Sequence, residues 1–146
     1  MTPEVAVAER LSDVNAVTAI VSTRIYSERL PQKPTYPAVL VRLVDEPRDA
    51  HLRGGIRDKA RVQVDAYVAE GNGTDAKQTC DELADAIHGD DAGSGLSGWA
   101  GSIGSPAFQV QGIIPIARGS DYESDELHLY RVWQDYQVLF GQAAMT

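Results

Sequence analysis

The sequence predicts an α+β domain, built on a mostly antiparallel sheet of about four or more strands with helices packed on one face. Residues 59–68 alternate strictly between apolar and polar side chains, which predicts a strand with one buried face. Apolar residues at helical spacing from Ala76 to Ile87 predict an amphipathic helix. The elements follow in the order helix, strand, strand, helix, strand, strand, without the alternation that is typical of a parallel sheet.

The N-terminal region predicts two short helices followed by an unusual connection. Pro3 suits a first helical turn, and Ser12 followed by Asp13 is a credible N-cap for the second helix. A short extended piece, residues 24–26, then leads into LPQKPTYP (residues 30–37), whose prolines favour extended backbone at the residues before them. We expect this segment to be a rigid strap that carries the chain from the helical region to the sheet.

The remaining strands are predicted from their apolar patterns. Residues 38–44 are apolar apart from one arginine, which indicates a strand covered on both faces. Residues 59–68 indicate one face on the core and one face in water. Residues 107–118 and 126–140 predict a hairpin, and a change of apolar phase near residue 130 predicts a bulge or a strong twist there.

The amphipathic helix has recognisable ends. Thr74 or Asn72 is placed to cap its start, Asp75 suits the positive end of its dipole, and Gly89 suits its end. The stretch that follows, residues 89–106, is rich in glycine and serine and predicts a loop.

Length and composition bound the class of protein. The 146 residues are most simply one domain, 1–146, and the single cysteine excludes an intramolecular disulfide. Neither a signal-peptide pattern nor an apolar run near ~18 residues is present, so we expect synthesis in the cytoplasm and no contact with a membrane. The formal net charge of −8 argues against a general binder of nucleic-acid phosphates.

A glycine motif in the loop invites a cofactor interpretation. Gly93, Gly95 and Gly98 form a literal G-x-G-x-x-G. A dinucleotide site needs this motif directly after a buried strand and at the start of a helix. Here it follows the end of a helix and opens none, which favours a flexible loop, and we predict no cofactor.

Candidate chemical groups are few. His88, Asp90 and Asp91 are possible metal ligands, but no second cluster supplies the remaining ligands at a recognisable spacing. Cys80 is a possible nucleophile, but it lies on the apolar stripe of the helix, where a buried cysteine is the simpler interpretation. The sequence therefore predicts no catalytic residue and no metal site.

Basic residues gather in one segment of this acidic chain. The segment is either a solvated hairpin tip or a contact arm that reaches an acidic surface on a neighbouring copy. Its members are Arg48, His51, Arg53, Arg57, Lys59 and Arg61.

An ordered set of segments resembles the tail-completion, or tail-terminator, proteins of long-tailed bacteriophages. The set is T-R-I-Y, L-P-Q…Y-P-A-V-L-V, R-V-Q-V-D-A-Y and G-T-D-A…C-D-E-L-A-D-A-I. The resemblance runs from about Val17 to Ile87 and resumes in the final strand at H-L-Y-R-V-W-Q-D-Y-Q-V.

The resemblance implies a virion protein of the tail and neck that performs no chemistry. Its subunits would form a ring, usually a homohexamer, that caps the finished tail tube, stops its polymerisation and joins the head or neck. The implied partners are further copies of the chain, the tail tube protein and a head-closure or neck protein. DNA would pass through the lumen without specific binding, and acidic residues are expected there. The predicted contact residues are Arg48, His51, Arg53, Arg57, Arg61 and Trp99.

Three alternatives stay open. The first is another neck component, such as a head-closure or connector-joining protein. The second is a small metal-dependent or cysteine enzyme that uses His88, Asp90, Asp91 or Cys80. The third is an acidic binding module with an unknown partner, which would not need a closed ring.

Overall fold

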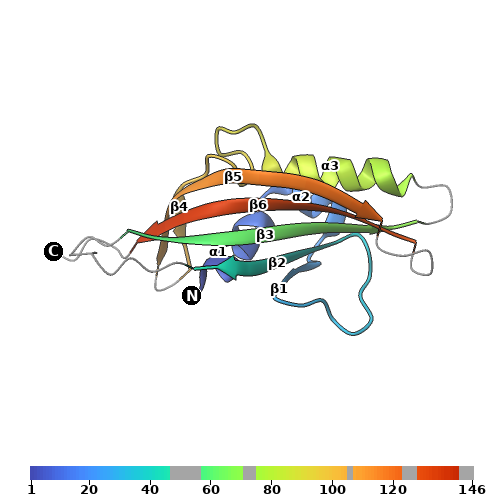
Figure 1. Ribbon diagram of the computed structural model, residues 1–146, viewed down its shortest axis with the longest axis horizontal. Helices are drawn as coiled ribbons and strands as arrows, with labels where there is room; N and C mark the ends of the chain where they lie inside the picture. The colour runs from blue at the N-terminus through green and yellow to red at the C-terminus, as the bar shows by residue number, and fades with distance from the viewer. Residues whose placement is uncertain (47–56, 71–74, 105–106, 123–127, 142–146) are drawn as a thin grey trace.

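The computed structural model describes residues 1–46, 57–70, 75–104, 107–122 and 128–141 (Figure 1). Within them it forms a mixed fold of three helices and a curled, mostly antiparallel six-stranded sheet. The elements are α1 (Pro3–Ser12), α2 (Asn15–Val21), β1 (Ile25–Ser27), β2 (Ala38–Asp45), β3 (Arg57–Ala69), α3 (Ala76–His88), β4 (Gly101–Ile103), β5 (Phe108–Tyr122) and β6 (Leu129–Gly141).

The order of strands in the sheet is β1-β2-β3-β6-β5-β4. Every neighbouring pair is antiparallel except β1 and β2, which are parallel. The proline-rich strap therefore joins two parallel neighbours, because the chain has already entered the sheet at β1. This differs from the predicted path from helix to sheet, and the short length of β1 explains why the sequence pattern hides it.

One hydrophobic core joins the helices to alternate residues of the strands. The predicted core face of β3 is confirmed, since its alternate apolar residues from Ala60 to Val68 are all buried. The predicted stripe of α3 is confirmed as well, and Leu83 and Ile87 are fully buried. We call the side of the sheet that faces this cluster the core side and the opposite side the outer side.

Helix ends differ from two predictions. The N-cap of α3 is Asp75, whose carboxylate accepts a hydrogen bond from the Gln78 N–H at 3.1 Å, as N-cap side chains do. Thr74 and Asn72, the predicted caps, lie outside the described residues. Ser12 ends α1 instead of capping α2, because its hydroxyl donates to the Glu9 carbonyl at 2.6 Å.

The bulge predicted near residue 130 is wrong. Strand β6 pairs with β3 in unbroken register from Leu129 to Gly141, and the irregularities lie in β5, at Val110/Gly112 and Pro115/Ala117. The apolar phase was misleading because Leu129, which pairs with Ala69 on the outer side, is buried at 4% exposure, whereas Val132, Tyr136 and Val138 face the core. Gln134 also takes a core position of β6, where it is 2% exposed and its hydrogen bonds satisfy its amide.

The segment after α3 is the predicted loop, but it is held in place and also contains β4. Leu96 is fully buried, and its N–H donates to the Ile87 carbonyl at 2.8 Å. Arg10 of α1 donates to the Gly93 carbonyl at 2.9 Å from the other side. The loop is therefore part of the packed fold and not a flexible connection. No helix in the described ranges is long and apolar enough to cross a membrane.

Candidate assembly surfaces

The predicted contact arm is only partly visible in the structure. Arg48, His51 and Arg53 lie outside the described residues, and for Arg57 the structure gives only the backbone, paired with Gly141 at the start of β3. Arg61 is described fully. Its side chain lies on the outer side of β3, remains 46% exposed and donates to the Asp135 carboxylate.

Trp99, the other predicted contact residue, lies in the loop between α3 and β4 and is half-buried. The Arg10 guanidinium stacks over its ring, 4.8 Å from the centroid, where cation–π attraction is favourable. Its ring also approaches Gly101 so closely that a Cβ there would lie 2.7 Å from it. Through these contacts Trp99 holds the loop against α1. Part of the Trp99 side chain stays exposed.

A buried charge network on the outer side was missed by the sequence analysis. Asp65 was expected in water, yet its side chain is 0% exposed. Its two carboxylate oxygens accept from Arg42 at 2.9 Å and from Arg131 at 3.1 Å. Burial raises the pKa of Asp65, although the two guanidinium groups oppose this shift. The one charged residue in the apolar run of β2, Arg42, was the signal that could have indicated the network.

The side chains considered above for catalysis or metal binding are buried or hydrogen-bonded within the fold. Cys80 is 1% exposed, and burial raises the pKa of its thiol to about 11, which disfavours the reactive thiolate. The ring nitrogens of His88 contact the Tyr136 hydroxyl at 3.0 Å and the Asp91 carboxylate at 2.7 Å. Asp90 accepts from two backbone N–H groups of its own loop. In the described part of the chain, no group of three or more His, Cys, Asp or Glu residues is placed to hold a metal.

The glycine motif is explained by packing. A Cβ on Gly95 would lie 2.6 Å from the Ile87 carbonyl oxygen, and Gly98 has a φ of +79°. Both positions therefore need glycine for the loop to approach α3 and turn. This local role accounts for the G-x-G-x-x-G without a dinucleotide.

Two edges of the sheet are open in the described residues. Strand β1 has β2 on one side and no described strand on the other, although its Ile25 N–H and Ser27 carbonyl are bonded to neighbouring residues of the chain. Strand β4 pairs with β5 as far as Val110 and the Gly98 N–H donates to the Ile113 carbonyl, so the edge of β5 without a described partner begins beyond Ile113. The exposed large hydrophobic residues of the described chain are Met1, Val44, Ile114, Ile116 and Tyr122, and most of them lie near these two edges.

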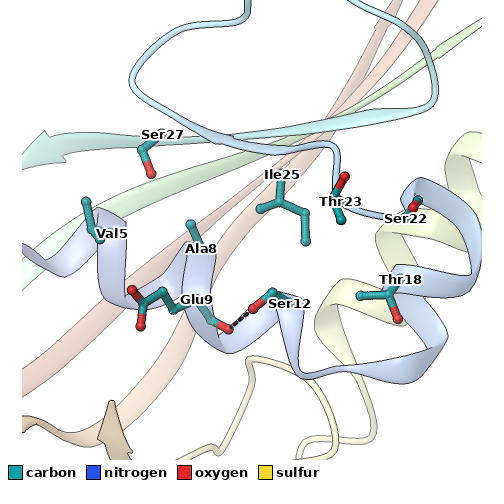
Figure 2. A pocket seen from close by; sticks show the side chains of 9 residues that line it. All are labelled: Val5, Ala8, Glu9, Ser12, Thr18, Ser22, Thr23, Ile25 and Ser27. Carbon is teal, nitrogen blue, oxygen red and sulfur yellow. Dashed lines mark hydrogen bonds between the residues drawn. The ribbon is translucent and has the colours of Figure 1, made fainter. Parts of the chain in front are cut away.

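A groove runs beside the β1 edge (Figure 2). It encloses about 550 Å³ between the two N-terminal helices and β1. Val5 and Ala8 of α1 face Ile25 of β1 across it, and Glu9 and small hydroxyl residues line its rim. An open strand edge next to a groove is the usual receptor for an added strand, because the edge supplies backbone hydrogen bonds and the groove accepts side chains.

These features define a class of protein before any comparison. The chemical groups weighed above are buried or hydrogen-bonded within the fold, whereas the exposed apolar residues lie at strand edges. Exposed apolar edge strands are a liability in a free monomer and are typical of chains that assemble with others.

Comparison with known proteins agrees with this class. A sequence profile of the family described as "Tail completion protein gp17" matches residues 5–141, so the chain belongs to that family, as the resemblance predicted. It is accordingly a structural protein of the phage tail.

One solved structure supports the fold. A chain of the "Virion of native gene transfer agent (GTA) particle" is similar with a TM-score of 0.58 and 15% identity. The alignment covers 96% of this chain and 95% of that one. At this identity the likeness shows the fold alone. A search of curated proteins found no match.

Proposed function

We propose that the protein caps the completed tail tube as a ring, ends its polymerisation and forms the joint to the head or neck. Membership of the tail completion family carries the proposal. The two open sheet edges support it, because a ring built by rotation joins two different surfaces of each subunit. The proposed partners are further copies of the chain in a ring of six, the tail tube protein and a head-closure or neck protein.

In this arrangement the helices pack on one face of the sheet and leave its outer side for contacts or for the lumen. The outer side carries the network of Asp65, Arg42 and Arg131, in which opposite charges are paired. A surface with paired charges attracts phosphates less than a basic one, so DNA passes the ring without being held.

The basic arm is proposed as a contact with the neighbouring subunit, together with Arg61 and Trp99. Reversal of Arg53 and Arg57 to Glu is expected to weaken ring formation, because like charges would then face an acidic chain. Lys33→Glu combined with Lys77→Glu, both exposed and outside the arm, is the matched control for the change of net charge. Light scattering during size-exclusion chromatography measures the assembly state, and an unchanged state in the arm variant removes the arm from the interface.

Electron microscopy of particles made without this chain tests the proposed function directly. Overlong and irregular tails, detached from DNA-filled heads, are the expected result. Tails of normal length that fail to join heads would place the protein elsewhere in the neck. Intact infectious particles would contradict a role in tail completion.

A further inference from the structure

The two open edges run in opposite directions, which allows them to pair. In the sheet β1 and β2 run one way, β3 the other way, β6 like β2, and β5 like β3. A rotation about an axis along the strands keeps these directions. It brings β5 of one subunit antiparallel to β1 of the next, and antiparallel neighbours need no crossover connection.

The β5 edge presents apolar side chains on both sides of the sheet. Ile116 lies on the core side, where it lines a hollow of about 440 Å³ with Tyr136 and Arg118. Ile114 pairs in register with Gln137 and points to the outer side. Each isoleucine is 48% exposed, which is a large apolar area for an edge strand.

The β1 edge also presents apolar residues. On the core side, the groove offers the apolar residues Val5, Ala8 and Ile25 with Glu9 on its rim (Figure 2). Val44 of the neighbouring strand β2 is 52% exposed at a register irregularity, beyond the part of β2 that β1 covers.

We infer that the β5 edge of one subunit packs against the β1 edge and the groove of the next copy around the ring, mainly through side chains, because Pro115 has no N–H and the Ile25 N–H and Ser27 carbonyl are already bonded within the chain. The inference rests on the proposed ring and assigns its subunit interface.

Ile116 enters the groove of Figure 2, and Ile114 meets Val44. The charges agree, since Arg118 flanks Ile116 and Glu9 lies on the rim of the groove.

A second copy is favoured over an unrelated peptide because one chain carries both halves of the contact. The same head-to-tail step covers both edges of every subunit once the ring closes. Arg118 already pairs with Asp85 at 2.7 Å and is 42% exposed, so it can contact a second carboxylate without a large rearrangement.

Cysteine cross-linking of the full chain tests the pairing. Thr23→Cys and Ser27→Cys, which line the groove, are each combined with Ile116→Cys on β5. The native Cys80 is 1% exposed and does not compete. Oxidation is expected to give a ladder of covalent oligomers from the double variants, whereas the single variants give none. Ile116→Cys combined with Lys77→Cys, on the exposed surface of α3, is the matched control.

The outcomes separate this inference from the proposed function. Rings that form but cross-link no better than the control overturn the edge pairing and leave the ring intact. A chain that forms no ring, either alone or on purified tail tubes, overturns the ring and the pairing together.

A charge exchange gives an independent test that does not depend on cysteine geometry. Glu9→Lys and Arg118→Glu are each expected to weaken assembly about tenfold, in the range of desolvated interfacial charge pairs. The double variant is expected to recover assembly, because the pair is restored with its signs exchanged. Equal weakening in the double variant, with unchanged thermal stability, overturns the pairing of these two residues.

Discussion

Strands β3 and β5 have similar lengths and very different surroundings. Strand β3 lies between β2 and β6, and even its outer side contains the buried carboxylate of Asp65. Strand β5 has β6 on one side, two irregularities in its register and exposed isoleucines along its free edge. The comparison indicates that the centre of the sheet stabilises the subunit, whereas its edge is available for assembly (Figure 1).

The largest effect is expected at the centre. Asp65→Ala leaves Arg42 and Arg131 without the carboxylate that they share. Because Arg42 stays 40% exposed and Arg131 keeps Asp121, the loss should lie near the lower end of the range for a broken buried ion pair, about 3 kcal/mol. Urea unfolding measures the loss. Asp121→Asn is the control, because this carboxylate binds the same Arg131 at the surface and is 51% exposed. Equal losses in the two variants would contradict a special role for the centre.

A smaller effect is expected where β5 meets β6. A Cβ on Gly119 would lie 2.3 Å from the Trp133 ring, so Gly119→Ala has to displace the indole, at a cost of about 1–3 kcal/mol for overpacking. Gly112→Ala in the same strand meets nothing within 4 Å and is the matched control. Thermal unfolding compares the two, and a stable Gly119→Ala variant would show that the indole moves freely.

At the free edge the effect on stability is expected to be minor and the effect on assembly large. Ile116→Ser removes a side chain that is 48% exposed, so the free energy of unfolding should change by less than about 0.5 kcal/mol. Ring formation should fall at least about tenfold, because the apolar contact in the groove is lost. Val62 in β3 is fully buried, so Val62→Ser should lower the free energy of unfolding strongly and have the smaller effect on assembly. Loss of stability without loss of assembly at Ile116 would contradict the division between centre and edge.

The smallest effect concerns pH and the loop beside the β5 edge. Hydrogen bonds from the Ser97 hydroxyl and from His88 hold the pKa of Asp91 below its ordinary value of 3.8. The stabilising effect of its charge is therefore complete above pH 3.8 and is lost as the pH falls through the lowered pKa. The difference in melting temperature between the wild type and Asp91→Asn should narrow below pH 3.8. A difference that stays constant with pH would show that the charge does not matter.

Much of the fold was predictable because period and apolarity report burial directly. The alternation in residues 59–68 and the helical stripe around Leu83 each needed one local pattern, and both were confirmed. Predictions failed where one residue contradicts its pattern. Leu129, buried on the outer side of β6, produced a false bulge, and Asp75, next to the predicted caps, is the N-cap of α3.

The candidate surfaces were less predictable. The sequence drew attention to the charged residues between Arg48 and Arg61, because charge is visible in a local window. It gave no sign of the groove at Ile25 and little of the free edge at Ile116, because both depend on which strands end up without a neighbour. Strand order is a long-range property, and the local sign beside Ile116 is Pro115, whose missing N–H fits an edge strand or a bulge.

By itself the sequence determined the types of the main elements, the face that each buries and the family to which the chain belongs. Those properties follow from side-chain period and from ordered local segments. Only the tertiary structure decided that Asp65 is buried between two arginines, that Arg10 clamps the loop at Trp99, and which strand edges stay open. Each of these depends on groups distant in sequence that meet only after the sheet has formed.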